Sequence, residues 1–253
     1  PVNVLWYAND FLYRILPRRV GQEVVLLNRT DLAAIVAEKW PADFDRLRAT
    51  LPPWTLAIVV SGLTRRPEEK VAYEVEFLKE IVRNEFRKLT LEEALPGFPG
   101  LGPKLLSLLR NPWPADVPYW KNRWQGGSQS LFFIARPEQA LKFVAIVETV
   151  APKHGYPVAD IGSYIQPIEH NRACQIEFTF FYKAADDAAK ARIAALYRDA
   201  ARSLMAEGAL FTRPYGELAT MVYERAANYT MALKRVKKIF DPNNIMNPGN
   251  LCF

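Results

Sequence analysis

The sequence predicts an α+β fold, a largely antiparallel sheet with helices on one face. Its apolar pattern switches repeatedly between the period of a strand and the period of a helix. Residues 131–207 follow the order strand, helix, strand, strand, helix, which resembles half of a ferredoxin-like domain. Half of the 253 residues are apolar, so the chain can bury a substantial core.

The first predicted strand and helix lie at residues 56–60 and 67–82. The strand is a short apolar run, and Pro67-Glu68-Glu69 supplies the proline and acidic residues that favour a helix start. This pair would begin a second, degenerate ferredoxin-like half. Further along the chain, the pattern predicts strands at 131–135, 159–165 and 174–182, and helices at 137–150, 184–207 and 217–239.

The segment between these two parts, residues 89–129, is rich in proline and glycine. Pro96-Gly97-Phe98-Pro99-Gly100 and Pro112-Trp113-Pro114 predict irregular structure. The segment is too aromatic for a flexible linker, so we expect it to be packed.

Composition argues against several classes of function. The net charge of +6 is scattered, and the densest basic run (Lys234, Arg235, Lys237, Lys238) lies near a helix end, where it interacts favourably with the helix dipole. A nucleic-acid site would need a basic stripe with interleaved aromatic residues, and the sequence has no such stripe. No apolar run reaches the ~20 residues of a membrane-spanning helix. Two cysteines and two histidines favour neither a disulfide framework nor a metal site, so we expect no metal and a cytoplasmic protein.

The strand at 174–182 carries the first candidate site. Side chains alternate across a strand, so Gln175, Glu177 and Thr179 share one face, while Ile176 and Phe178 share the other. The apolar face would pack on helices. The polar face is either a solvated side of the sheet or a substrate site in which Glu177 accepts a proton.

The most specific motif lies at the C-terminus, where the chain reads Phe240-Asp241-Pro242-Asn243-Asn244-Ile245-Met246-Asn247-Pro248-Gly249. The prolines and asparagines end the preceding helix and favour tight turns. This run resembles the C-terminal signature of the FAD-linked oxidases of the vanillyl-alcohol oxidase and p-cresol methylhydroxylase superfamily. The segment 211–216 stands where phenol-oxidising members carry a Tyr-Arg pair that faces the substrate, although Thr212 replaces the tyrosine.

The resemblance implies an FAD-dependent dehydrogenase or oxidase that transfers hydride from an alcohol, hydroxy acid or phenol to flavin N5. It implies a cap domain at 51–210 built from the ferredoxin-like halves, a segment 1–50 at the end of an FAD-binding domain, and a C-terminal segment 211–253 that packs on that domain. The candidate residues are Glu177, Arg213 and Tyr215 for catalysis, Gln175, Thr179, His170 and Tyr223 for substrate, and Asn243, Asn244 and Asn247 for cofactor. The alternatives are a surface salt bridge for Arg213, a solvated turn position for His170, and core packing for the two tyrosines.

The glycines are not clustered as a pyrophosphate-binding loop requires. We therefore expect most of the FAD to be held by a separate or cleaved polypeptide, in an oligomer that binds a small-molecule substrate. The Gly-Glu-His-Gly-like run of the hydroxy-acid dehydrogenases is also missing. The alternative is a non-catalytic ferredoxin-like subunit that binds a small molecule or a partner protein.

Overall fold

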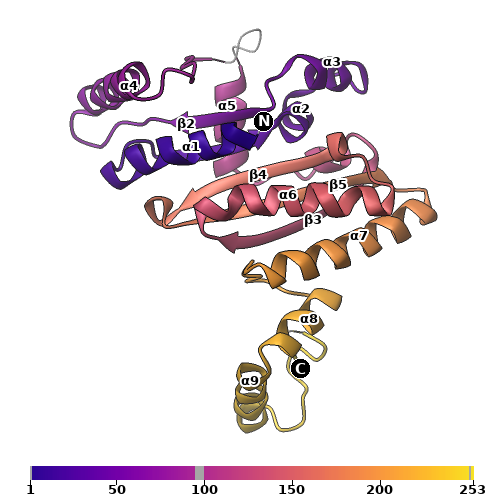
Figure 1. The fold of residues 1–253 in the computed structure, drawn as a ribbon. Helices are drawn as coiled ribbons and strands as arrows, with labels where there is room; N and C mark the ends of the chain where they lie inside the picture. The colour runs from indigo at the N-terminus through magenta and orange to yellow at the C-terminus, as the bar shows by residue number, and fades with distance from the viewer. Residues whose placement is uncertain (1, 95–99, 251) are drawn as a thin grey trace.

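The structure is a computed structural model that describes residues 2–94, 100–250 and 252–253. Its centre is a five-stranded antiparallel sheet in the order β2-β1-β4-β5-β3 (Figure 1). The strands are β1 (Glu23–Asn28), β2 (Trp54–Val59), β3 (Gly126–Ala135), β4 (Ile161–Ile168) and β5 (Ala173–Lys183). The predicted α+β class with an antiparallel sheet is confirmed.

The helices lie on both faces of this sheet. The α-helices are α1 (Val2–Ile15), α2 (Arg29–Val36), α3 (Ala42–Thr50), α4 (Pro67–Asn84), α5 (Leu101–Arg110), α6 (Ala140–Val150), α7 (Asp187–Ala206), α8 (Glu217–Arg225) and α9 (Ala227–Phe240). The short 3-10 turns are η1 (Leu16–Arg18), η2 (Trp120–Asn122), η3 (Pro137–Gln139), η4 (Ala151–His154), η5 (Val158–Asp160) and η6 (Glu169–Asn171).

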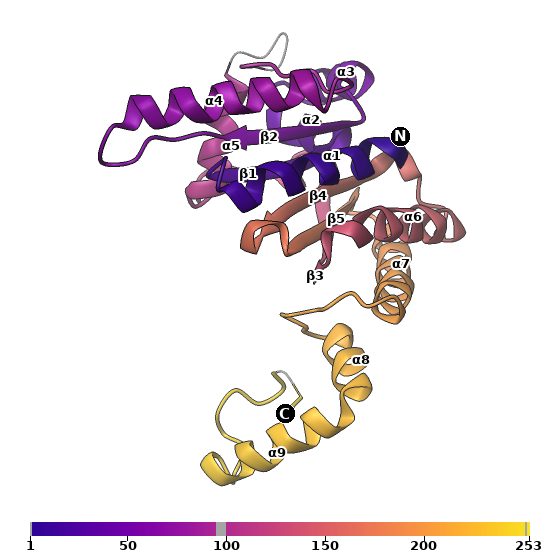
Figure 2. The same cartoon turned by 60° about the vertical axis from the view of Figure 1, so that its left-hand side comes forward.

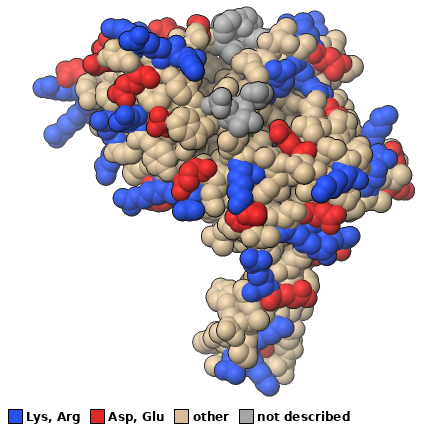
Figure 3. All heavy atoms as spheres, in the orientation of Figure 1, with Lys and Arg blue, Asp and Glu red and all other residues tan. Residues whose placement is uncertain are grey.

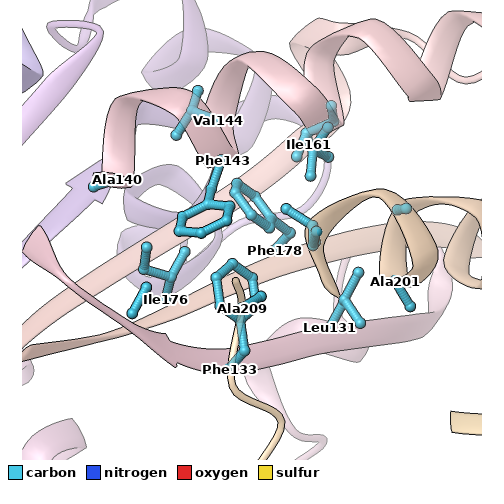
Figure 4. Packing of buried hydrophobic residues seen from close by; sticks show 14 of the residues in the cluster. Leu131, Phe133, Ala140, Phe143, Val144, Ile161, Ile176, Phe178, Ala201 and Ala209 are labelled. Carbon is cyan, nitrogen blue, oxygen red and sulfur yellow. The ribbon is translucent and has the colours of Figure 1, made fainter. Parts of the chain in front are cut away.

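The main core lies between the sheet and helices α1, α6 and α7. Phe133 of β3 is fully buried there, and its ring lies 5.0 Å from that of Phe143 on α6 and 6.2 Å from that of Phe178 on β5 (Figure 4). The predicted apolar face of residues 174–182 therefore packs on helices, as expected. A smaller core joins α1, α4 and the start of β1.

A third core covers half of the opposite sheet face, so helices pack on both faces and not on one face as the sequence predicted. Helices α2, α3 and α5 and the turn η2 pack there on Val25 and Leu27 of β1 and on Phe181 of β5. Helix α5 and η2 come from the segment expected to be irregular. The apolar residues Leu101 and Leu105 bury one side of α5, so packing overrides the proline and glycine content of the segment. Of the irregular segment predicted at 96–100, residues 96–99 lie outside the described residues.

The predicted helix over 217–239 is divided into α8 and α9 at Ala226. The Thr230 hydroxyl donates a hydrogen bond of 2.7 Å to the Tyr223 carbonyl, which replaces helical bonding at the break. Both helices extend away from the sheet (Figures 1 and 2). Among its described residues, α9 buries no side chain.

The N-terminal segment enters the same sheet, because β1 pairs with both β2 and β4. The division into segments 1–50, 51–210 and 211–253 stays a prediction. On the face seen in Figure 3, acidic and basic side chains are interspersed. Within the described part of the chain, no helix is long and apolar enough to cross a membrane.

Candidate functional site

The second face of the sheet divides into a covered half and an open half. Thr179 and Phe181 of β5 are fully buried under the α2 side, whereas Gln175 and Glu177, earlier on the same strand and face, are only half-buried. The open half continues onto the neighbouring strands. It comprises the half-buried side chains of Phe132, Ile134, Tyr164, Gln166, Gln175 and Glu177.

Glu177 stands at the border of the two halves, where Lys121 of η2 donates a hydrogen bond to its carboxylate. Lys121 also donates to the Ser130 hydroxyl at 3.0 Å, on strand β3. Only 9% of the Lys121 side chain and 15% of the Glu177 side chain are exposed, so this is a buried ion pair with an edge toward solvent. Within the predicted polar row, Thr179 is fully buried, Glu177 is ion-paired and Gln175 is half-buried, so the row differs in exposure from one residue to the next.

The surroundings of Lys121 stabilise its charged form. Burial acts to lower its pKa, but the Glu177 and Asp31 carboxylates outweigh this effect and hold the pKa above its ordinary value. The ammonium also lies 5.2 Å from the centre of the Trp120 ring. Sequence reasoning missed Lys121, because a lone lysine in an aromatic loop carries no signal of the strand it will contact.

Asp31 is the second residue that sequence reasoning missed. It lies in the first turn of α2 and is completely buried, and neither carboxylate oxygen has a hydrogen-bond partner among the described residues. Burial raises the pKa of Asp31 to about 7, while Lys121 acts to lower it and Glu177 acts to raise it. An acidic residue in a first helical turn is so common that it gave no reason to expect a site.

The remaining predicted side chains are distributed along one end of the sheet and the C-terminal arm, which comprises α8, α9 and the turn beyond them. His170 lies exposed in the turn between β4 and β5, at the end of the sheet that carries Gln175. Leu210 forms a β-bridge with Ile134, the residue that pairs with Gln175. Arg213 and Tyr215, both exposed, follow Leu210 in the chain and therefore begin from this end of the sheet. The structure thus brings Gln175, Glu177 and Thr179 onto one face.

The candidates on the arm do not join that cluster within the described structure. Tyr223 is half-buried on α8, and Asn243, Asn244 and Asn247 are exposed beyond α9. Asn244 and Asn247 both have φ of 51°, the left-handed conformation that asparagine tolerates in turns. Their roles toward a cofactor stay predictions.

The turn after α9 is organised by Asp241, which is buried. Its carboxylate accepts hydrogen bonds of 2.9 Å from the backbone N–H groups of Ile245 and Met246, and one of 2.6 Å from Lys237. The Lys237 bond and these backbone donors lower the pKa of Asp241 to about 2. The C-terminal motif is therefore a built turn that keeps Ile245 and Met246 exposed.

The half-open sheet face, with the Lys121–Glu177 ion pair at its border, is the candidate site of this fold. Residues 170–251 match the family model described as FAD linked oxidases, C-terminal domain. The fold is similar to that of 4-ethylphenol oxidase from Gulosibacter chungangensis, solved as an isoeugenol complex, with a TM-score of 0.63 and 16% sequence identity. The match covers 90% of this chain and 47% of the oxidase, so this chain spans about half the length of that protein. A search of curated proteins gives no match.

The family match confirms the predicted resemblance over residues 170–251, which are similar to the C-terminal domain of FAD-linked oxidases. At 16% identity, the likeness to 4-ethylphenol oxidase establishes a shared fold. The family implies FAD. In the described residues, no group of three or more histidine, cysteine or acidic side chains is placed to hold a metal ion.

The side chains of the open half are of the types that contact a flavin ring in a binding site. Phe132 and Ile134 offer apolar contact, and Gln166 and Gln175 offer hydrogen bonds, all from half-buried positions on paired strands. This correspondence covers only the ring, since the glycines form no cluster that would bind the pyrophosphate.

Proposed function

We propose that this chain is the substrate-side part of an FAD-dependent oxidoreductase that oxidises an alcohol, hydroxy acid or phenol. The observation that carries the proposal is the position of the Lys121–Glu177 pair at the edge of a half-open sheet face, in a chain with an FAD-linked oxidase C-terminal portion. Bound FAD would supply the acceptor for the hydride of the substrate.

In this proposal, Glu177 accepts the hydroxyl proton of the substrate. A general base must lie within hydrogen-bond reach of the proton it takes, and Glu177 retains an exposed edge for that purpose. Lys121 fixes the carboxylate on the sheet, and Gln175 orients the substrate from the next position on the same face. Arg213 would pair with an anionic substrate group from the end of the sheet.

The FAD-binding half would lie on other polypeptide and pack against the C-terminal arm, defined as α8, α9 and the turn beyond them. The arm exposes many large apolar side chains. These are Tyr229, Met231, Val236, Ile239, Phe240, Ile245 and Met246, exposed by 48% to 79%. Such a patch is typical of a surface that is buried in the assembled protein.

The test is reduction of the flavin by substrate in the complete protein that carries this chain. The native protein should be yellow, and a panel of alcohols, hydroxy acids and phenols should contain a compound that bleaches it. Glu177→Gln should slow bleaching by about 10²–10⁴-fold, the usual contribution of a general base.

Glu207→Gln provides the matched control. It removes an exposed ion pair with Lys142 on the other side of the sheet and should leave the rate unchanged. A colourless complete protein, or an unchanged rate in Glu177→Gln, would contradict the proposal.

A second candidate, a binding subunit without redox activity, is favoured by one observation. A hollow of about 560 Å³ lies on the α6 side of the sheet, away from Glu177, with Arg29, Arg48 and Glu148 among its lining residues. This candidate predicts no flavin in the complete protein and ligand binding that is sensitive to Arg48→Ala.

A further inference from the structure

The carboxyl group of Asp31 is held against the sheet by an unusual local connection. The Asn28 side-chain oxygen accepts hydrogen bonds of 3.0 Å from the Asp31 N–H and from the Ser163 N–H, so one amide links α2 to β4. The Asn28 amide nitrogen donates to the Ile161 carbonyl at 2.7 Å. These bonds flank Gly162 on both sides and fix Asp31 above it.

Gly162 is needed there because it has no side chain. A Cβ at this position would lie 2.7 Å from Asp31 Cγ and 3.0 Å from Thr179 Cβ. The Thr179 hydroxyl, like both Asp31 oxygens, is buried without a hydrogen-bond partner in the described chain. The carboxyl group is thus packed onto bare backbone, where a negative charge would be poorly solvated.

The charge of one buried lysine acts on both carboxyl groups, although Asp31 accepts no hydrogen bond from it. Lys121 donates to Glu177 and Ser130, and the charges of both Asp31 and Glu177 act on it. With Asp31 protonated, Lys121 and Glu177 balance each other. With Asp31 ionised, two buried carboxylates compete for one ammonium, and the group carries a net negative charge.

We propose that the buried Asp31 carboxyl group changes between a neutral and an ionised form and that its ionisation draws Lys121 away from Glu177. Asp31 is thereby a positioning residue that makes the setting of Glu177 dependent on pH. Its predicted effect on turnover rests on the proposed function, whereas the competition for Lys121 does not. The elevated pKa of Asp31 agrees with this assignment.

Other ionisable groups also act in and around the cluster. They are Tyr156 near Asp31, Tyr164 near Glu177, Tyr119 near Lys121, and Glu23, Arg48 and Asp160, whose charges act on the two buried tyrosines. Burial raises the pKa of both Tyr156 and Tyr164, so these two hydroxyls stay neutral near neutral pH.

The experiment is a pH titration of the complete protein with ¹³C-labelled aspartate carboxyls and ¹⁵N-labelled lysine, followed by NMR. Asp31→Asn assigns the aspartate signal. We expect that signal to titrate near neutral pH and the Lys121 Nζ resonance to shift with the same midpoint. The midpoint should fall in Glu177→Gln, which removes a neighbouring anion, and rise in Lys121→Met, which removes the cation.

Asp116→Asn, a change at an exposed loop position, is the control and should leave the titration unchanged. The inference would be overturned if Asp31 titrated in the acidic pH range of ordinary carboxyl groups. It would also be overturned if neither Glu177→Gln nor Lys121→Met shifted the midpoint.

The rate of flavin bleaching against pH is a separate readout. It should show a step at the Asp31 midpoint that Asp31→Asn abolishes, and a step that persists in this variant would refute the positioning role. Absence of bleaching alongside an intact coupled titration would refute the proposed function alone.

Discussion

The Asp31 carboxyl group lies directly on the backbone of Gly162, at a separation that leaves no room for a side chain. We expect Gly162→Ala to lower the free energy of unfolding by about 1–3 kcal/mol, the usual effect of overpacking a core. Urea denaturation measures it. Gly102→Ala on α5, where a Cβ would meet nothing within 4 Å, is the control and should be neutral or slightly stabilising. If the clash is with Asp31, Asp31→Ala should reduce the cost of Gly162→Ala.

The buried Asp31 should also make stability depend on pH. In the unfolded chain it ionises near its ordinary pKa of 3.8, whereas in the folded chain its pKa is about 7. The unfolded state therefore loses its proton first, and the Asp31 contribution to stability falls as pH rises from about 4 to about 7. A shift of this size is worth on the order of a few kcal/mol. Unfolding curves of Asp31→Asn should lack this decline, and a decline of equal size in the variant would contradict the assignment.

Phe133 is the centre of the main core. Its ring contacts those of Phe143 and Phe178 (Figure 4). It also lies 5.5 Å from the ring of Phe211. Phe133→Ala should cost about 3–5 kcal/mol of unfolding free energy, because it leaves a cavity among three rings. Phe133→Leu should cost clearly less. If the two variants lose similar amounts of unfolding free energy, the surrounding core collapses to fill the cavity.

The two cysteines should differ in reactivity. Cys174 is buried, and burial raises its thiol pKa to about 12, whereas Cys252 is half-buried near the end of the arm. Only the thiolate reacts readily. Alkylation of the native protein at mildly alkaline pH, followed by mass spectrometry, should modify Cys252 and spare Cys174 until denaturant is added. Modification of Cys174 in the native state would show that β5 opens locally.

Asp241 should control the turn beyond α9. Asp241→Ala removes the acceptor of the Ile245 and Met246 N–H groups, so amide exchange at these two residues should accelerate. In the wild-type protein, the contribution of Asp241 is present above its ordinary pKa of 3.8 and is lost as pH falls toward about 2. Asp45→Ala at an exposed position of α3 is the control. Unchanged amide exchange at Ile245 and Met246 in Asp241→Ala would contradict the role of Asp241 in this turn.

Local pattern was sufficient to predict most of the elements. The alternation from Cys174 to Tyr182 predicted both the strand and the burial of its apolar face, and residues 67–82 predicted most of α4. The break at Ala226 was not predictable, because it depends on the Thr230 hydroxyl binding the Tyr223 carbonyl in place of helical bonds.

The candidate site was predicted only in part. Glu177 and its strand neighbours follow from a period of two residues within one segment. Lys121 and Asp31 lie 56 and 146 residues before Glu177 in the chain. Their contacts depend on how η2 and α2 fold back over the sheet, which no local pattern encodes.

The pairing of β1 with β4 ties the beginning of the chain to the strand that shares a hairpin with β5. A protein shortened to begin at residue 51 would strip β4 of this neighbour and uncover a row of backbone donors and acceptors beside Tyr164 and Ile165. Unpaired strand edges of that kind form hydrogen bonds with strands of other molecules. Such a product should self-associate, so dissection of this protein into smaller soluble pieces ought to keep its first fifty residues.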